Sequence, residues 1–245
     1  MFDALFAELK GKNALVTGAS RGIGKAVALA LAEAGSNVAI HYIEDGNNEE
    51  QSQEVSRCIK SMGAGCAIVE GNVGFAYDVS RIVQEAGIGL NGTIDVLVNN
   101  AGVGGPKRFE DTSEEEFEKQ CAINMKSVFL FAQALVPQMC AQKWGRIVNI
   151  SSSAVFTGGR SGPHYAASKA GVLGLTRYYA ASLAKDGITV NAVSPGPINT
   201  DMVKAYPAGD YLGETQDIVA AVLCLLSTGF ITGHTLHVNG GLYMS

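Results

Sequence analysis

Short apolar segments alternate with amphipathic segments along the chain. The apolar segments are rich in β-branched and aliphatic residues and predict seven strands, over residues 13–17, 37–42, 66–70, 95–98, 146–150, 188–193 and 235–238. The segments between them space apolar residues three and four positions apart, which predicts helices that begin near Gly22, Asn48, Phe75, Ser113, Met125, Pro163 and Glu214. Because each crossover between parallel strands needs a covering helix, this order predicts a doubly wound α/β fold, with helices on both faces of a seven-stranded parallel sheet.

The chain of 245 residues is long enough for one large α/β domain, and no linker, repeat or low-complexity stretch interrupts the pattern. We therefore expect a single domain over residues 1–245. In doubly wound sheets, ligands bind beyond the carboxyl ends of the strands. Candidate functional residues should accordingly lie just after predicted strands.

A glycine-rich turn follows the first predicted strand, within residues 17–24. Glycines in such a turn adopt backbone angles closed to other residues and let a diphosphate approach the backbone near a helix N-terminus. The alternative is an ordinary glycine-rich turn between a strand and a helix, since short glycine motifs also occur without this function. The dinucleotide hypothesis assigns cofactor contacts here to Gly18, Ser20, Arg21, Gly22, Ile23 and Gly24.

Three more segments that follow strands suit a dinucleotide. The segment 99–102 offers small and amide side chains that could line an adenosine pocket and tie neighbouring strands. Residues 72–73 lie where an amide meets the adenine edge, and segment 195–200 lies where the chain passes the nicotinamide. An asparagine at a strand end is also a common turn former, and a threonine before a helix could instead cap it. The candidate cofactor residues are Asn72, Val73, Asn99, Asn100, Ala101, Gly102, Pro195, Gly196, Ile198 and Thr200.

Residues near the end of the second strand bear on the choice of cofactor. An acid there would bind the ribose 2′-hydroxyl of NAD, whereas a nearby arginine accommodates the 2′-phosphate of NADP. Tyr42 occupies the position of that acid, and Arg21 lies within the glycine-rich turn. Glu44 and Asp45 lie slightly further along the chain and add negative charge. We therefore favour NADP(H) as the cofactor, with NAD(H) as the alternative.

A serine, a tyrosine and a lysine follow the fifth strand. Ser152 lies in a serine run at the strand end, and Tyr165 and Lys169 are an i, i+4 pair on one face of the helix that Pro163 opens. A free phenol titrates near ~10, and a neighbouring ammonium lowers the pKa of that phenol. The alternative is a surface tyrosine beside a solvated lysine. The combination with the glycine-rich turn and Ser152 favours a catalytic constellation.

In this order, the motifs resemble those of the short-chain dehydrogenase/reductase family, from about Lys10 to the C-terminus. The shared segments are T-G-A-S-R-G-I-G, N-N-A-G, the Ser and Tyr-x-x-x-Lys set, and P-G-P-I. The resemblance implies a single-domain Rossmann-type fold and an NAD(P)(H)-dependent oxidoreductase that acts on a carbonyl or hydroxyl group. It also implies a homotetramer, paired through long helices over 125–141 and 163–184 and through the last strand.

The same resemblance implies roles for four residues. Ser152 would hydrogen-bond the substrate oxygen, and Tyr165 would pass the proton to it. Lys169 would hold the nicotinamide ribose and lower the pKa of Tyr165. Asn124 would support a water path to Lys169, although it could instead mark a helix kink or cap. Preorganised donors stabilise the charge that builds on a carbonyl oxygen during hydride transfer, so we expect no metal.

Within the family, the segments 14–27, 165–176 and 231–244 are most similar to bacterial 3-oxoacyl-[acyl-carrier-protein] reductases. This similarity implies a 3-oxoacyl thioester substrate and acyl carrier protein as a partner. That partner is acidic, so its recognition needs basic residues. Lys143 falls on one such position, whereas Asp186, beside Lys185, falls on the other.

Other substrates therefore stay open. The segment 200–217, where the family usually has a longer helical flap over the substrate, is short and contains a proline and two glycines. Because family and fold do not fix the substrate, the alternatives are a general carbonyl reductase or an alcohol or sugar dehydrogenase. A non-catalytic NADP(H)-binding sensor is a further alternative, although such a protein would usually lose the serine, the tyrosine or the lysine.

Composition argues against several other classes of protein. With a net charge of −5, the chain lacks the excess of basic residues that is typical of proteins that bind nucleic acid or anionic lipid. The five cysteines are scattered without a C-x-x-C pair, so they predict no metal site and fit a reducing cytoplasm. The N-terminus lacks the features of a signal peptide, and no apolar run is long enough to cross a bilayer. We expect a soluble cytoplasmic protein with no nucleic-acid or membrane partner.

Overall fold

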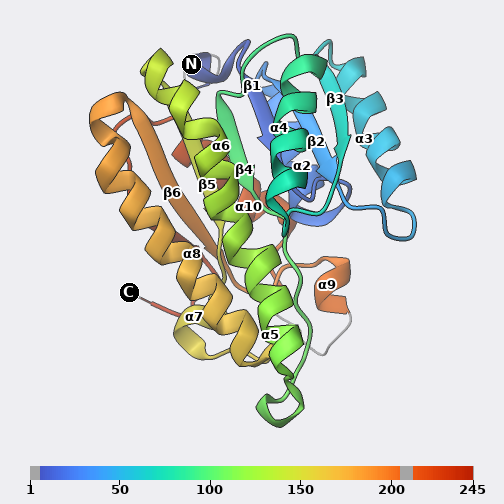
Figure 1. The fold of residues 1–245 in the computed structure, drawn as a ribbon, viewed down its shortest axis with the longest axis vertical. Helices are drawn as coiled ribbons and strands as arrows, with labels where there is room; N and C mark the ends of the chain where they lie inside the picture. The colour runs from blue at the N-terminus through green and yellow to red at the C-terminus, as the bar shows by residue number, and fades with distance from the viewer. Residues whose placement is uncertain (1–5, 205–211, 245) are drawn as a thin grey trace.

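Seven parallel strands form one sheet at the centre of the computed structural model, which describes residues 6–204 and 212–244 (Figure 1). The spatial order of the strands is β3-β2-β1-β4-β5-β6-β7. The strands are β1 (Asn13–Val16), β2 (Asn37–Tyr42), β3 (Cys66–Glu70), β4 (Val96–Asn99), β5 (Gly145–Ile150), β6 (Ile188–Pro195) and β7 (Thr235–Val238). This is the doubly wound, Rossmann-type parallel sheet that the alternation of apolar segments predicts.

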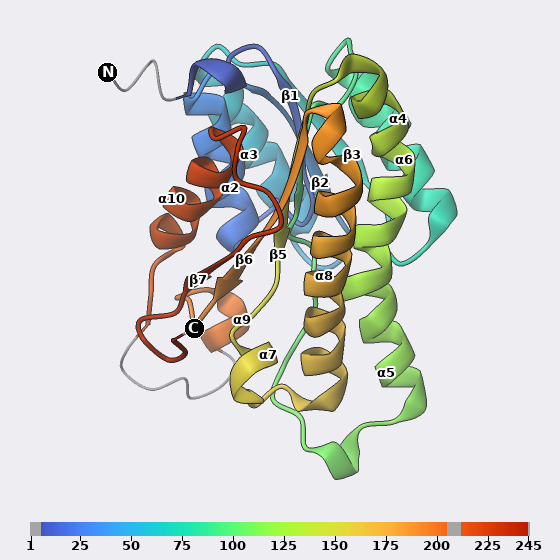
Figure 2. The ribbon, with the colours of Figure 1, turned by 90° about the vertical axis from the view of Figure 1, so that its left-hand side faces the viewer.

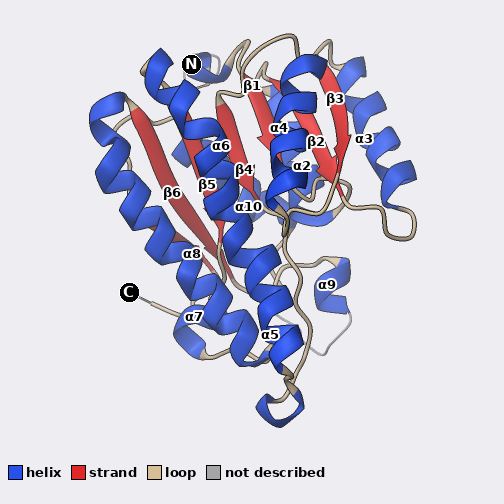
Figure 3. Ribbon diagram, viewed as in Figure 1, coloured by secondary structure: helices blue, strands red, loops and turns tan. Residues whose placement is uncertain are grey.

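Helices cover both faces of the sheet (Figure 2). One layer contains α2 (Gly22–Glu33), α3 (Asn48–Ser61) and α10 (Thr215–Leu226), and the other contains α4 (Ala76–Gly89), α6 (Ser127–Gln142) and α8 (Gly162–Leu183). The short helices α7 (Ala154–Thr157) and α9 (Asp201–Lys204) lie with the lower part of α5 (Glu114–Cys121) beyond the strands' carboxyl ends (Figure 3). Short 3-10 turns occur at Ala7–Leu9, Phe109–Asp111 and Ala184–Asp186.

The central strands have no polar face because both of their faces are covered. In β1, Ala14 and Val16 pack in the core beneath α2, α3 and α10, while Leu15 packs in the core beneath α4, α6 and α8. All three side chains are fully buried. Phe131 of α6 is the largest side chain buried completely, and it anchors the second core. Burial on both faces explains why these strands read as continuous apolar runs.

Local signals define where several helices begin. The Ser113 hydroxyl accepts a hydrogen bond from the backbone N–H of Glu116, and the Glu116 carboxylate accepts one from the Ser113 N–H, so the two residues form a capping box at the start of α5. Pro163 lies in the first turn of α8, where a helix tolerates a residue without an N–H. Glu214 and Asp217 form a second capping box before α10.

The helix expected to begin near Met125 has a different start. A π-helical turn over Ala122–Lys126 joins α5 to α6, so the helical path runs from Glu114 to Gln142. An extra residue in one turn breaks the apolar period, and the sequence therefore reads as two separate helices. Such turns often occur at functional sites.

The two strands at the middle of the sheet send the chain in opposite directions. From β1 the chain enters α2 on one face, whereas from β4 it proceeds to α5 on the other face. A crevice opens beyond the carboxyl ends where neighbouring connections diverge in this way. Of the short flap expected over 200–217, residues 205–211 lie outside the described residues. Among the helices that the structure describes, none has the length and apolar character to cross a membrane.

Candidate active site

The glycine-rich turn after β1 is shaped by positive backbone angles and close packing. Gly18 and Gly22 have φ values of +63° and +57°, which side chains with a Cβ rarely adopt. A Cβ at Gly24 would overlap the carbonyl oxygen of Gly18, so this glycine lets the start of α2 pack against the turn. Gly24 therefore shapes the turn without lining the cavity that the other glycines border.

Hydrogen bonds fix this turn to the segment that follows β4. The Thr17 hydroxyl accepts hydrogen bonds from the backbone N–H groups of Asn100 (3.0 Å) and Ala101 (2.9 Å). In return, the Asn100 amide donates to the carbonyl oxygens of Thr17 and Gly18, each at 2.9 Å. The two strand ends are thus joined where the sheet changes direction.

A cavity of ≈ 490 Å³ lies between these two strand ends. Its lining contains most of the residues predicted to contact the adenosine and diphosphate, and also polar residues that sequence reasoning missed. The predicted lining residues are Gly18, Ser20, Arg21, Gly22, Ile23, Tyr42, Asn72, Val73, Asn100, Ala101, Gly102 and Thr200. The missed ones include His41 and Asn48, and the lining also contains Asp45, whose negative charge near the pocket was expected.

The structure does not bring Asn99 into this cavity. Its side chain is buried and donates to Asn149 Oδ1 of β5 at 2.8 Å. Asn149 in turn donates to the hydroxyl of Thr176 in α8 at 2.9 Å. The side chain of Asn99, the last residue of β4, is thus directed toward β5 and α8, whereas Asn100, which follows the strand, lines the cavity. Asn99 ties neighbouring strands to α8.

Asn72 was expected either to contact the cofactor or to form a turn, and the structure is compatible with both. Its side-chain oxygen accepts a hydrogen bond from the N–H of Gly74 at 3.0 Å, and its own N–H donates to Asp78 at 2.9 Å. Asn72 is therefore a turn former, and it lines the cavity as well. Tyr42 also lines the cavity, where burial and then the carboxylates of Glu49, Glu70 and Glu44 raise the pKa of its phenol.

His41 supports the glycine-rich turn from β2. Its Nδ1 accepts a hydrogen bond from the N–H of Gly18 at 3.1 Å, and its Nε2 lies 3.0 Å from the carbonyl oxygen of Gly71. This pattern requires the neutral ring with its proton on Nε2. The side chain is 2 % exposed, and burial lowers its pKa from 6.5 to about 4, opposed by the bond to Gly71. His41 is therefore neutral at physiological pH.

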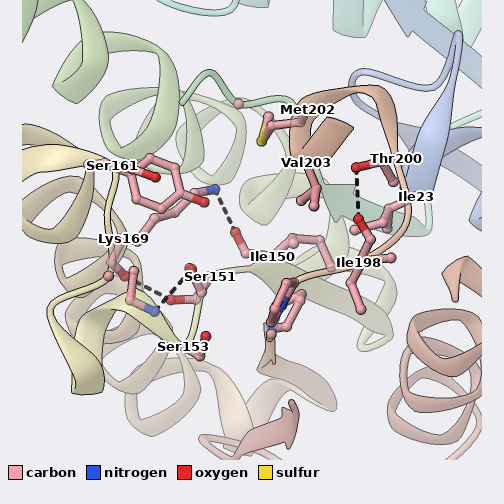
Figure 4. A pocket seen from close by; sticks show the side chains of 18 of the residues that line it. Ile23, Ile150, Ser151, Ser153, Ser161, Lys169, Ile198, Thr200, Met202 and Val203 are labelled. Atoms are coloured by element: carbon pink, nitrogen blue, oxygen red, sulfur yellow. Dashed lines mark hydrogen bonds between the residues drawn. The ribbon is translucent and has the colours of Figure 1, made fainter. Parts of the chain in front are cut away.

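A second cavity has a volume of ≈ 430 Å³, and Figure 4 shows side chains that line it. The two cavities form one groove because they share lining residues from the glycine-rich turn, the β4 end and the β6 end. Figure 4 shows Lys169 and Ser151 on one side of the second cavity and Ile198, Thr200 and Ile23 on the other. The shared residues are Ile23, Asn100, Gly102, Thr200 and Met202. Of the predicted residues, Ser152, Tyr165, Lys169, Pro195, Gly196 and Ile198 line this second cavity.

The lysine of the Tyr-x-x-x-Lys pair is buried beside the tyrosine. Lys169 is 4 % exposed, and its Nζ donates to the carbonyl oxygen of Ile150 at the end of β5, at 2.9 Å. The same Nζ lies 6.0 Å from the centroid of the Tyr165 ring. Burial lowers the pKa of Lys169 from 10.5 to about 8. The ammonium therefore stays largely protonated at neutral pH and places a positive charge near the phenol.

Ser152 follows the end of β5 and opens the turn into α7. Its hydroxyl accepts a hydrogen bond from the N–H of Ala154 at 3.1 Å. The preceding Ser151 donates through its hydroxyl to the backbone carbonyl of Lys169 at 2.9 Å, so the β5 end is fixed to α8. Gly104 packs against the tyrosine, since a Cβ there would come 2.7 Å from the Tyr165 ring. These contacts hold the serine, tyrosine and lysine around one cavity.

Asn124 lies in the π-helical turn and is 1 % exposed. Its side chain accepts from the N–H of Val103 (2.8 Å) and donates to the Val103 carbonyl (2.9 Å) and to the hydroxyl of Ser168 (3.1 Å). A Cβ at Gly102 would lie 3.3 Å from both Asn124 Oδ1 and Lys169 Nζ, so the amide and the ammonium approach the same glycine. Asn124 therefore lies in an irregular helical turn and also close to Lys169, so the structure contains the features of both expected roles.

The two positions considered for carrier-protein recognition lie next to each other in the structure. Lys143 and Asp186 form an ion pair with each other on the surface. The hydrogen bond to Asp186 and its charge raise the pKa of Lys143, and the partner carboxyl has a lowered pKa for the same reason. The positive charge of Lys143 is therefore balanced by Asp186 within the chain.

Comparison with known proteins identifies relatives over nearly the whole chain. The family model described as short chain dehydrogenase matches residues 12–210. The 3-oxoacyl-[acyl-carrier-protein] reductase FabG of Staphylococcus aureus is 41% identical over 247 residues, which are 95% of this chain and 98% of that protein. The enzyme of the same name from Vibrio cholerae is 40% identical over 250 residues, which cover 96% of this chain and 99% of the relative.

A solved structure adds a comparison in three dimensions. The blue fluorescent protein from a metagenomic library, in complex with NADPH, is 33% identical and superposes with a TM-score of 0.88, covering 96% of this chain and 99% of its own. Because the family model covers most of the chain, this protein belongs to the short-chain dehydrogenase family and is an oxidoreductase that acts on carbonyl or hydroxyl groups.

The burial of His41 predicts a pH dependence of stability. Between its native pKa of about 4 and the ordinary value of 6.5, the unfolded chain binds a proton at this ring and the native protein does not. Stability should therefore be complete above pH 6.5 and fall as the pH drops toward about 4, by about 3 kcal/mol from this group. His41→Gln, which cannot titrate, should show a free energy of unfolding that falls less steeply over this range in urea titrations.

The exposed ring of His234 provides the matched control for that experiment. His234→Gln should keep the pH slope of the unmodified protein. Equal slopes in all three proteins would show that His41 does not carry this dependence.

Proposed function

We propose that this member of the short-chain dehydrogenase family is an NADP(H)-dependent reductase of a 3-oxoacyl thioester or a closely related carbonyl compound. The observation that carries the proposal is the joining of two cavities into one groove. The glycine-rich turn lines one end of the groove, and Ser152, Tyr165 and Lys169 line the other. A groove of this kind suits an elongated cofactor whose reactive end meets a substrate at the second cavity.

The lining of the groove fits a dinucleotide. The positive φ values of Gly18 and Gly22 leave backbone open to a diphosphate at the start of α2. Arg21 is exposed at the N-terminus of that helix and borders the cavity beside Tyr42, which supports NADP(H) as the preferred cofactor. Asp45 borders the same cavity and opposes that preference. When bound, the reduced cofactor supplies the hydride for the reaction.

Three side chains of the second cavity would carry the proton chemistry. Ser152 would donate a hydrogen bond to the carbonyl oxygen of the substrate, and Tyr165 would transfer its phenolic proton to that oxygen as negative charge develops there. The buried ammonium of Lys169 favours the ionised phenol and so makes the proton easier to release. Lys169 would also hold the ribose next to the nicotinamide, and Asn124, which approaches the same glycine as the ammonium, would support a water path to Lys169.

The similarity to the two reductases supports a 3-oxoacyl thioester as substrate. The names of these two relatives specify a 3-oxoacyl group carried by acyl carrier protein, and we include this partner in the proposal. The ion pair between Lys143 and Asp186 favours a second candidate, a reductase of carbonyl compounds that are not bound to a carrier protein. The five free cysteines support a reducing, cytoplasmic location.

A homotetramer is part of the proposal. Ala167, Ala170 and Gly174 are exposed along one face of α8, and a Cβ at Gly174 would meet no atom within 4 Å. Phe117 of α5 and Phe129 of α6 are 41% and 39% exposed. Small residues permit close approach of helices, and apolar rings exposed on neighbouring helices are typical of an interface between copies. By contrast, Gly171 packs against Met125 within the chain.

A substrate panel tests the proposed activity. We expect the enzyme to oxidise NADPH in the presence of a 3-oxoacyl thioester with a higher kcat/KM than with simple ketones or sugars. The loss of reduced-nicotinamide absorbance measures the reaction. Cofactor binding without turnover of any carbonyl compound in the panel would contradict an enzymatic function, and a preference for sugars would move the protein to another substrate class.

Tyr165→Phe tests the proton donor. The change removes one oxygen from a packed ring, so folding and NADPH binding should persist while kcat falls by ~100-fold or more. Tyr178→Phe is the matched control, because that tyrosine is on the same helix but 67% exposed and outside the cavity lining. Near-normal turnover in Tyr165→Phe would rule out this role.

Arg21→Ala tests cofactor preference. If the guanidinium binds the 2′-phosphate, NADPH affinity should fall by ~1.5–3 kcal/mol while NADH affinity changes little, as expected for a charge-assisted hydrogen bond. Lys25→Ala is the control on the same helix, since Lys25 pairs with Glu54 and does not line the cavity. Equal losses for the two cofactors would mean that Arg21 only shapes the turn.

Light scattering at micromolar concentration tests the assembly. We expect a mass about four times 25.5 kDa for the unmodified protein. Gly174→Glu would place a charge on the small-residue face of α8 and should lower this mass. A stable monomer with full activity would contradict the tetramer.

A further inference from the structure

The end of the chain brings an apolar side chain to the second cavity. Residues 239–244, here called the tail, follow β7, and Leu242 of the tail lines this cavity together with Ser152 and Tyr165. The side chain of Leu242 is 55% exposed. Covering exposed apolar surface with another apolar group is favourable, so Leu242 offers a contact that the proton chemistry does not use.

Hydrogen bonds around Asn239 shape the tail. The Asn239 amide donates to the carbonyl oxygen of Tyr243 at 3.0 Å, and its side-chain oxygen accepts from the N–H of Gly241 at 3.0 Å. The N–H of Leu242 donates to the backbone carbonyl of Asn239 at 3.1 Å. A Cβ at Gly196 would come 2.8 Å from the Cα of Asn239, so the tail begins in close contact with the residues after β6. These contacts fix the backbone on both sides of Leu242.

Three aromatic rings hold the tail against α7 and β7. Tyr243 stacks on Phe156 of α7, with ring centroids 4.4 Å apart and 19° between the ring planes. His237 of β7 packs edge-on against Phe156 at 4.8 Å and lies 5.0 Å from the Tyr243 ring. Aromatic pairs at these separations attract each other beyond the burial of their area. Because Leu242 directly precedes Tyr243, this aromatic cluster also determines where Leu242 lies.

The residues after β6 add further apolar side chains to the same cavity. These include Pro197, Ile198, Met202 and Val203. Figure 4 shows Ile198 and Val203 across the cavity from Lys169. A substrate whose carbonyl group is bound near the lysine would therefore extend its carbon chain along an apolar wall, to which the tail contributes.

We propose that Leu242 is a specificity-determining residue that contacts the apolar acyl chain of a 3-oxoacyl thioester. The chain would cover the exposed carbons of Leu242, so the contact favours acyl groups longer than the short acetoacetyl group. Phe156 and Tyr243 are positioning residues, because they act through Leu242. This inference rests on the proposed reduction of 3-oxoacyl thioesters and adds a preference for chain length.

Steady-state kinetics with two thioesters test the proposal. 3-Oxooctanoyl-N-acetylcysteamine carries the longer chain and acetoacetyl-N-acetylcysteamine the shorter one, and neither needs a carrier protein. Leu242→Ala should lower kcat/KM for the longer substrate about five- to tenfold, mainly through KM, because the contact is present before and during the reaction. The kcat/KM of the shorter substrate should stay nearly unchanged. Leu242→Met, which keeps the apolar area, should retain the preference for the longer chain.

Met244→Ala is the matched control. Met244 lies in the same tail, is 82% exposed and does not line the cavity, so its truncation should leave both kcat/KM values unchanged. Tyr243→Ala removes the stacked ring and should reproduce the effect of Leu242→Ala, whereas Tyr243→Phe keeps the ring and should preserve the preference. A ring that only stabilised the fold would change the turnover of both substrates alike.

The results distinguish the acyl contact from assembly and from catalysis. Equal losses for both thioesters in Leu242→Ala, or no loss for either, would overturn the proposal. A smaller mass in light scattering together with such equal losses would instead assign Leu242 to a contact between subunits. Failure of the unmodified protein to reduce the acetoacetyl thioester would contradict the proposed function. Calorimetric titration with octanoyl-N-acetylcysteamine, which lacks the oxo group, would still test the contact, because Leu242→Ala should weaken this binding and Met244→Ala should not.

Discussion

The site depends on one constraint, which is that the chain leaves β1 and β4 toward opposite faces of the sheet. The two strands are neighbours in the sheet, yet one leads to α2 and the other leads to α5 on the opposite face. The space between the two connections is the origin of the groove. Hydrogen bonds between Thr17 and Asn100 join the two strand ends beside that space. These bonds are possible because the turn at Gly18 passes close to the β4 end. Every later contact of the site is positioned from this junction.

Beyond that junction, the site is built from residues at or just after the carboxyl ends of four more strands. β2 and β3 contribute Tyr42 and Asn72 to the first cavity, and β5 and β6 contribute Ser152 and Thr200 to the second. The long helix α8 then brings Tyr165 and Lys169 to the end of β5, where Lys169 bonds to Ile150. Parallel strands place all their carboxyl ends at one edge, so residues more than a hundred positions apart meet without any long excursion of the chain.

The sequence was most informative where function depends on local spacing. The seven strands follow from apolar periodicity, and the Tyr-x-x-x-Lys pair shares a helix face because of its spacing alone. Contacts between distant segments were not accessible in this way. His41 reads as an ordinary strand residue, because its partners Gly18 and Gly71 come from other segments. The sequence allowed Asn99 either to line the cavity or to tie neighbouring strands, and only its hydrogen bond to Asn149 in the next strand decides for the second. The position of Leu242 at the second cavity depends on the packing of the tail against α7, which no periodicity encodes.

Burial has different consequences for the charge of two basic side chains in this site. Burial lowers the pKa of both His41, to about 4, and Lys169, to about 8. The imidazole is consequently neutral at pH 7, and the neutral form is the one that accepts a hydrogen bond from Gly18. The ammonium of Lys169 is still mostly charged at that pH, so its burial costs about 3 kcal/mol of stability, a cost removed only as the pH rises from about 8 toward 10.5. The fold therefore tolerates the cost of a buried cation near the Tyr165 ring, and it avoids that cost at His41, where the neutral ring accepts a hydrogen bond.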